Sequence, residues 1–180
     1  MNIDNIISDL IFIKPEIAIA ATLVLIVLVD LISPKSKKVL PYLSLLGIAI
    51  AGVFVIQQFG TPAQFAFKTS SSSGMFAADN FGSFFKIIVL LASVFVIFFS
   101  MSSSELKSAH DRLGEYYTLM FGMILGMFFM ASASDLILIY ISIELLSLSS
   151  YVLAGFVKNT IRSSDPHLNL FIHLGEAFQR

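Results

Sequence analysis

The stretch that decides the fold is Asp135-Leu-Ile-Leu-Ile-Tyr-Ile-Ser-Ile-Glu-Leu-Leu-Ser-Leu-Ser-Ser-Tyr-Val-Leu-Ala-Gly-Phe156. It is long enough to cross a bilayer as a helix, which takes about 20 residues. Near its middle stands one acidic residue, Glu144. A charge at the centre of a spanning helix costs at least ~2.5–3.5 kcal/mol, so chains that keep one usually handle protons or ions with it. Glu144 is therefore the leading candidate functional residue. The alternative is a protonated side chain, or one that caps a helix–helix contact through a neighbouring serine.

The whole chain has the composition of a membrane protein. Hydrophobic residues make up 57% of its 180 residues and charged residues only 13%, and the mean hydropathy is +0.88. The absence of cysteine excludes iron–sulfur clusters, disulfides and thiolate metal sites from this chain. It has no glycine-rich dinucleotide or phosphate motif, so we expect no direct NADH binding. A net charge of −1 without a basic cluster argues against nucleic acid as a partner.

Five apolar runs reach the length of a membrane span, so the sequence predicts an all-α, polytopic transmembrane helical bundle. The predicted spans cover residues 11–32, 39–59, 81–101, 116–131 and 136–157. They form one membrane domain over residues 1–164, followed by a polar, atypical tail at 165–180. Only residues 132–135 separate the last two spans, which predicts a tight antiparallel helical hairpin.

The distribution of basic residues predicts how the bundle is oriented in the membrane. Seven basic residues follow the first, third and fifth spans, namely Lys35, Lys37, Lys38, Lys107, Arg112, Lys158 and Arg162. The other side carries Lys14, Lys68 and, at the mouth of the third span, Lys86. Because basic loops stay in the cytoplasm, we expect a multi-pass protein with its N-terminus outside.

Lys86 is the second candidate site residue, because it is the obvious cationic partner within the chain for Glu144. It lies in Phe84-Phe85-Lys86-Ile87, near the outer end of the third span. The competing interpretation, which we favour, is that its stem lies along the helix while the ammonium snorkels to the interface.

The remaining ionisable residues have ordinary structural interpretations. Glu16 and Asp30 lie near opposite ends of the first span, where helix-end placement explains them. Asp79 and Asp135 directly precede spans and are expected in the first turn or at the N-cap. None of the three histidines has the spacing of a helical metal site, so we expect no metal in this chain.

Small and hydroxylated residues surround Glu144 on the fifth span. Serines stand at 142, 147, 149 and 150, followed by Ala154 and Gly155. Such residues permit close helix approach and interhelical hydrogen bonds, so we expect this span to lie inside a bundle.

The strings Met130-Ala-Ser-Ala-Ser-Asp-Leu136 and Tyr140-Ile-Ser-Ile-Glu-Leu-Leu-Ser-Leu-Ser-Ser-Tyr-Val-Leu-Ala-Gly-Phe156 resemble subunit N of NADH-quinone oxidoreductase, respiratory complex I. The mitochondrial counterpart of that family is NADH dehydrogenase subunit 2. The resemblance extends to Met75-Phe-Ala-Ala-Asp-Asn-Phe-Gly-Ser-Phe-Phe-Lys86 and to Pro15-Glu16, and covers roughly residues 10–164. The serine-rich run after Glu144 favours subunit N over the paralogous subunits L and M.

The resemblance implies a role in proton translocation coupled to electron transfer from NADH to quinone. Members of this family are antiporter-like subunits in which a Glu on the fifth helix pairs with a Lys on the seventh. Glu144 matches that Glu by its position in the motif. The resemblance also implies that NADH, FMN, iron–sulfur clusters and quinone are held by partner subunits. It implies other membrane-arm subunits and the lipid bilayer as partners, and the bacterial inner membrane as the location.

The sequence departs from the family pattern at its end. Residues 165–180 are too short and too polar to span a membrane, and the Lys-bearing seventh helix is absent. We therefore expect an antiporter-like architecture truncated before the sixth helix, inactive as a chain on its own. Two other interpretations stay open, a truncated non-catalytic five-span membrane protein and a small stand-alone ion channel or transporter.

Overall fold

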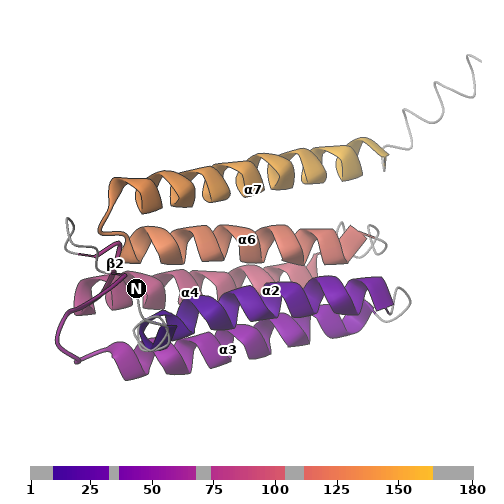
Figure 1. Ribbon diagram of the computed structural model, residues 1–180. Coiled ribbons are helices and arrows are strands. Elements are labelled where there is room, and N and C mark those ends of the chain that lie inside the picture. The colour runs from indigo at the N-terminus through magenta and orange to yellow at the C-terminus, as the bar shows by residue number, and fades with distance from the viewer. Residues whose placement is uncertain (1–9, 33–36, 68–73, 104–111, 164–180) are drawn as a thin grey trace, which may run out of the picture.

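The computed structural model describes residues 10–32, 37–67, 74–103 and 112–163, with side chains up to residue 155. Within these ranges the fold is a bundle of five long helices lying side by side (Figure 1). They are α2 (Lys14–Ile32), α3 (Leu40–Gln58), α4 (Asn80–Ser102), α6 (Leu113–Ser132) and α7 (Leu136–Ser163). All five are long and apolar enough to cross a membrane. The predicted class, a helical bundle of about five spans, is confirmed, and the predicted 165–180 tail lies outside the described residues.

Local sequence signals explain where the helices begin. A proline lies in the first turn of both α2 and α3, where its missing N–H leaves no hydrogen bond unmade. The Asp79 side chain accepts a hydrogen bond from the Gly82 amide at 2.8 Å and caps α4, as predicted. Two short 3-10 turns, η1 (Ile11–Ile13) and η2 (Lys37–Val39), precede α2 and α3.

A small β-hairpin between α3 and α4 was not predicted. Strands β1 (Gln64–Ala66) and β2 (Phe76–Ala78) pair antiparallel, and Phe76 also forms a bridge with Ala133 in the α6–α7 turn. The Ser134 amide donates to the Met75 carbonyl at 3.1 Å. Strands of three residues are too short to show an alternating pattern, so only the loop between them is visible in the sequence. The hairpin ties two connections together at one end of the bundle.

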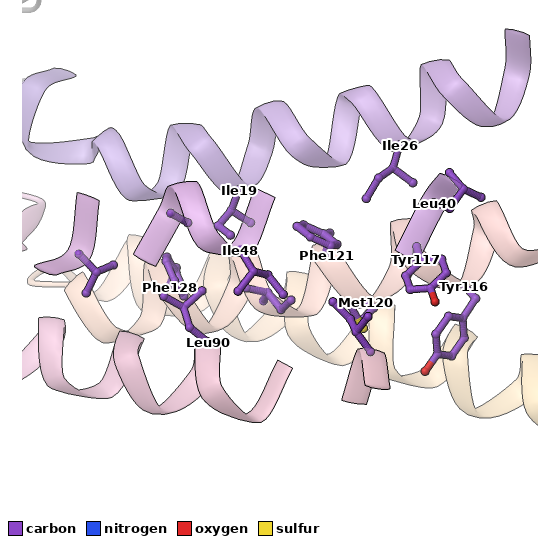
Figure 2. Packing of buried hydrophobic residues seen from close by; sticks show 14 residues of the cluster. Ile19, Ile26, Leu40, Ile48, Leu90, Tyr116, Tyr117, Met120, Phe121 and Phe128 are labelled. Atoms are coloured by element: carbon purple, nitrogen blue, oxygen red, sulfur yellow. The ribbon is translucent and has the colours of Figure 1, made fainter. Parts of the chain in front are cut away.

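Helix α6 is the centre of the bundle. It packs against α2, α3, α4 and α7, and half of its span is buried, whereas only 11% of the α7 span is. Its aromatic residues Tyr117, Phe121 and Phe128 fill the core that Figure 2 shows together with Ile19 from α2 and Leu90 from α4. Since lipid tails are as apolar as these side chains, close packing is what holds such helices together.

Glycines on α6 permit the close approach of α7. A Cβ added at Gly126 would lie 3.1 Å from the Leu146 backbone nitrogen, and one at Gly122 would lie 2.8 Å from Ser149 Oγ. These two glycines have the small-xxx-small spacing of close membrane helix pairs. On α7, Ser142 and Ser149 are buried against this surface. The prediction that small residues bring the fifth span close to a neighbour is thus met on this face.

The opposite face of α7 is exposed. It carries Tyr140, Ile141, Leu148 and Tyr151 along with Glu144. Among the described helices α7 packs chiefly against α6, so the expected enclosure of the fifth span is seen on one side only.

Candidate functional site

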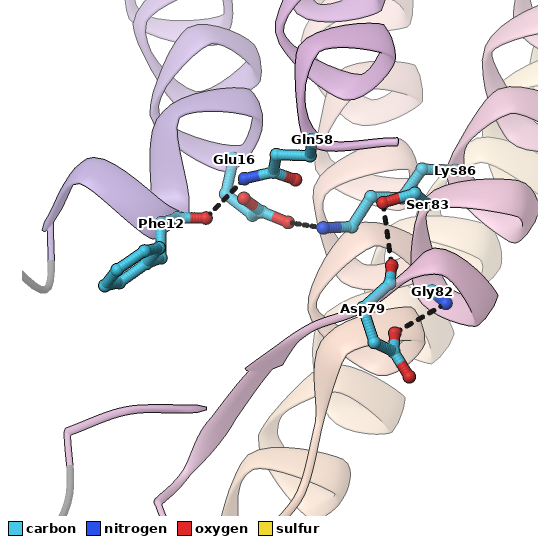
Figure 3. A network of polar contacts seen from close by, with 7 residues as sticks. All are labelled: Phe12, Glu16, Gln58, Asp79, Gly82, Ser83 and Lys86. Carbon is cyan, nitrogen blue, oxygen red and sulfur yellow. Dashed lines mark hydrogen bonds and ion pairs between the residues drawn. The ribbon is translucent and has the colours of Figure 1, made fainter. Parts of the chain in front are cut away.

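A buried ion pair between α2 and α4 is the most concentrated polar feature among the described residues. Lys86 Nζ lies 2.6 Å from Glu16 Oε1, and each side chain is only 1% exposed. Glu16 is the third residue of α2 and Lys86 the seventh of α4, so both lie near the end of the bundle that carries the hairpin. Figure 3 shows the two side chains pointing toward one another across the space between their helices.

Two aromatic rings lie close to the Lys86 ammonium. Its Nζ lies 5.3 Å from the ring centre of Phe76 on β2 and 5.9 Å from that of Phe128 on α6. Both distances fall in the range in which the negative face of a ring attracts a cation. One turn earlier on α4, the Ser83 hydroxyl donates to the Asp79 carbonyl at 2.8 Å. The site therefore joins α2, α4, α6 and the hairpin.

Gln58, at the end of α3, contacts the turn that precedes Glu16. Its Nε2 donates to the Phe12 carbonyl at 2.6 Å, one helical turn before Glu16. Gln58 and Phe12 also line a pocket of about 250 Å³, whose other polar lining residues are Lys14, Gln57, Thr61 and Gln64. The Gln58 side chain is thus shared by the pocket and by the surroundings of the ion pair.

The ion pair corrects two predictions made from sequence. Lys86 does not snorkel, because its ammonium is buried and paired, and its partner is Glu16 instead of Glu144. Glu16 does lie in the first turn of α2, as predicted, but its carboxylate is buried against a cation and not simply placed at a helix end. Membrane helices one and three run parallel in the predicted topology. These two helices carry opposite charges at similar depth in the membrane, and this sequence feature could have predicted the pair.

Glu144 lies on the exposed face of α7, as the ninth residue of that helix. The neighbouring Ser147 hydroxyl donates to the backbone carbonyls of Ile143 and Glu144, at 2.7 and 3.2 Å, and not to the Glu144 carboxylate. The structure therefore does not bring the two predicted site residues, Glu144 and Lys86, together as a pair.

Asp30, the other acidic residue of the first span, forms structural contacts. Asp30, near the end of α2, pairs with Lys37 at 3.2 Å. A Cβ added at Gly114, at the start of α6, would collide with the Asp30 carboxyl group. Asp30 thus joins the ends of three elements, which goes beyond the predicted helix-end placement. No group of three His, Asp or Glu residues that could hold a metal ion occurs in the described part of the chain.

A larger pocket, of about 610 Å³, lies between the hairpin and the facing ends of α4 and α6. Its lining is mostly apolar, with Phe81, Phe85 and Met127 among its members, and Asp79 contributes its one charged residue. Neither Glu16 nor Lys86 lines it, so this pocket is separate from the ion pair.

The arrangement can perform proton chemistry. An ammonium and a carboxylate at hydrogen-bond distance can share one proton, and in a medium of low dielectric each strongly controls the charge of the other. Such a pair can hold two opposite charges, and a proton added to the carboxylate leaves a neutral acid beside the ammonium. The fold and these groups define a multi-pass membrane protein that keeps ionisable residues within its spans.

Comparisons with known proteins place this chain among respiratory membrane subunits. It is 42% identical over 91% of its length to NADH-quinone oxidoreductase subunit N of Dehalococcoides mccartyi. It is 38% identical over 88% of its length to NADH-quinone oxidoreductase subunit N 2 of Chloroherpeton thalassium. The F(420)H(2) dehydrogenase subunit N of Methanosarcina mazei is 33% identical over 92% of the chain. No family model matches the chain.

The chain belongs to the NADH-quinone oxidoreductase subunit N family over the residues that these comparisons cover. It spans about a third of the length of the curated relatives it matches, 32%, 30% and 34% of the three in the order named above.

Proposed function

We propose that this chain is part of the membrane arm of a proton-translocating NADH-quinone oxidoreductase, with Glu144 as a proton relay. The observation that carries the proposal is the place of Glu144, in the middle of an apolar span and on the face of α7 that no described helix covers. A charged residue facing lipid at this depth would cost several kcal/mol. This face of α7 must therefore contact protein or water in the working assembly.

The redox chemistry belongs to partner subunits in this proposal. The chain has no cysteine to hold an iron–sulfur cluster and no dinucleotide motif, so FMN, NADH and quinone would be bound elsewhere. Its partners would be the other membrane-arm subunits and the lipid of a bacterial inner membrane. The N-terminus would lie outside, as the seven basic residues of the opposite loops favour.

The relative from Methanosarcina mazei bears on the function of the region that aligns with this chain. Its name identifies it as a subunit of an F(420)H(2) dehydrogenase, and it aligns over 92% of this chain. A subunit shared by enzymes named for different electron donors is better suited to a common step in the membrane than to oxidation of the donor. This favours proton movement over any role in NADH binding.

The test is substitution of Glu144 in the assembled complex. In inverted membrane vesicles supplied with NADH, proton uptake would be measured by quenching of a pH-sensitive dye, and electron transfer by NADH oxidation. Glu144→Gln keeps the size of the side chain and removes its charge. We expect proton uptake to fall at least about tenfold, the size of effect that proton-transferring groups commonly contribute.

Glu115→Gln is the matched control, because Glu115 is an exposed acid at the start of α6 that pairs with Arg112. It should leave proton uptake unchanged. Equal uptake in Glu144→Gln and Glu115→Gln would overturn the relay role of Glu144. Recovery of the chain apart from any NADH-oxidising assembly would favour the non-catalytic or stand-alone alternatives.

A further inference from the structure

We propose that Glu16 and Lys86 form a proton-exchange site that water reaches through the pocket beside Gln58. The access of water to the pair stands on the geometry alone, whereas the exchange of protons during turnover rests on the proposed function. This site is separate from Glu144, which lies on α7 and does not pair with Lys86.

The pocket lies at the end of the bundle where α2 begins, and it includes Phe12 in the turn before Glu16. Lys14, Gln57, Thr61 and Gln64 give its wall four polar side chains that can bind water, and Gln58 is a fifth. Gln58 Nε2 donates to the carbonyl of Phe12, one turn before Glu16, so the same side chain lines the pocket and contacts the turn that leads to the carboxylate. Figure 3 shows the Gln58 amide directed toward the Phe12 carbonyl and the Glu16 carboxylate directed toward Lys86.

Two buried acceptors on these side chains have no hydrogen-bond partner within the described part of the chain. They are Glu16 Oε2 and Gln58 Oε1. A buried carboxylate or amide oxygen without a partner costs roughly 1–3 kcal/mol, so such groups normally bind ordered water. One water that bridges these oxygens would satisfy both and would connect the pocket with the ion pair.

The path ends at the ion pair. On the far side lie Ile19 from α2, Leu90 from α4 and Phe128 from α6, all part of the close-packed core. Neither pocket described here extends into that core. Among the described residues, the pocket beside Gln58 lies at the end of the bundle where α2 and α4 begin, so we place water access to the pair on that side.

The exchange step is the transfer of one proton between water and the carboxylate. A hydronium in the pocket gives its proton to Glu16 Oε2, becomes water, and leaves the site with the net charge of the Lys86 ammonium. The reverse step restores the neutral ion pair. The other charged groups among the described residues at this end are Lys14 at the pocket, Asp79 at the cap of α4 and Asp135 just before α7, and α3 and α6 place no described acid or base there.

Water access would be measured with introduced thiols, because the chain has no cysteine of its own. Glu16→Cys is combined with Lys86→Met so that no charge is left unpaired. A small water-soluble methanethiosulfonate is applied to the assembled complex, and labelling is followed by mass spectrometry of the peptide. Ile19→Cys, one turn further along α2 and fully buried, is the control.

We expect the thiol at position 16 to react at least about tenfold faster than the one at position 19, because a buried position reacts only when it opens transiently. Adding Gln58→Leu, which replaces the polar side chain by an apolar one, should slow labelling at position 16 and leave position 19 unchanged. Equal rates at the two positions, or no effect of Gln58→Leu, would overturn the water path.

Proton exchange during turnover is tested with the double variant Glu16→Gln/Lys86→Met in the complex. We expect normal assembly, with proton uptake per NADH oxidised reduced at least about twofold, well within what a single proton-transferring group contributes. Normal uptake in the double variant together with loss in Glu144→Gln would overturn the exchange role and leave the proposed function standing. Normal uptake in Glu144→Gln would instead count against the proposed function, and the labelling rates would then decide the water path by themselves.

Discussion

The ammonium of Lys86 lies 2.6 Å from the carboxylate of Glu16, and both side chains are buried between α2 and α4. Two charges within an apolar bundle are tolerated because each compensates the other, although removing both from water has a large cost of its own. The energetic consequence is asymmetric. Losing one partner is far more harmful than losing both.

The first prediction concerns this asymmetry. Lys86→Met leaves the Glu16 carboxylate buried and unpaired, which should lower the free energy of unfolding by about 3–5 kcal/mol. The double variant Glu16→Gln/Lys86→Met removes both charges and should recover most of that loss. Denaturant titration of the protein in detergent, followed by helix content, measures both. If the double variant is no more stable than Lys86→Met, the unpaired Glu16 charge is not the cause of the lost stability.

The exposed pair of Arg112 and Glu115 is the matched control for this experiment. Its atoms lie 3.2 Å apart, but the side chains are 46% and 56% exposed. Arg112→Met should therefore change stability by less than about 1 kcal/mol, the usual worth of a solvated ion pair. A loss as large as that of Lys86→Met would argue against burial as the source of the asymmetry.

The second prediction uses the close contact of α6 and α7. A Cβ at Gly122 would lie 2.8 Å from Ser149 Oγ but 3.7 Å from Ser149 Cβ, so Gly122→Ala should destabilise by about 1–3 kcal/mol through overpacking. Adding Ser149→Ala removes the oxygen and should restore most of the stability. Thermal unfolding of the two variants in detergent measures the difference. If Ser149→Ala does not restore the stability lost in Gly122→Ala, the steric clash is with another residue.

Gly126 gives the third prediction, since its neighbours are backbone atoms that no substitution can remove. A Cβ there would lie 3.1 Å from the Leu146 nitrogen and 3.2 Å from the Ser142 carbonyl oxygen. Gly126→Ala should cost about 1–3 kcal/mol, and Ser149→Ala should not rescue it. Gly52→Ala is the control, because the nearest atom to its Cβ would be 3.7 Å away, on a Leu90 side chain. Equal thermal stability of Gly52→Ala and Gly126→Ala would contradict the assigned packing.

The helices could be predicted from sequence because a membrane span is marked by its own length and composition. The partners of single charged side chains could not, because pairing depends on which helices are neighbours and on their rotation. Lys86 shows the difference. Its depth near a span end suggested snorkelling, yet its side chain reaches Glu16 on α2, a helix that α4 does not pack closely against.

The contact between α6 and α7 could be predicted in part from the sequence. The serines of α7 indicated close packing, but the glycines that receive them stand on α6, at positions 122 and 126. Their spacing of four residues was present in the sequence and would have identified the facing surface. The hairpin offered no such signal, because its strands of three residues depend on contacts with Ala133 and the helix ends.

The fourth prediction tests the cap of α4. Asp79→Ala removes the acceptor that the Gly82 amide uses at 2.8 Å and should cost about 0.5–2 kcal/mol. The loss should be local, with faster hydrogen exchange of the first-turn amides of α4. Asp79→Asn keeps an acceptor oxygen and is the control. Identical exchange in Asp79→Ala and Asp79→Asn would show that the cap does not hold this turn.

The last prediction concerns orientation and uses the absence of cysteine from the chain. Thr61 follows α3 at the end of the bundle where α2 begins, and Lys38 precedes α3 at the opposite end, and both are exposed. Seven basic residues follow the first, third and fifth spans, so the Lys38 end should be cytoplasmic. In intact cells an impermeant maleimide should label Thr61→Cys and spare Lys38→Cys, and in inverted vesicles the order should reverse. Ile48→Cys, buried within α3, should stay unlabelled in both. Labelling of Lys38→Cys in intact cells would invert the topology, and the pocket beside Gln58 would then open to the cytoplasm instead of the outside.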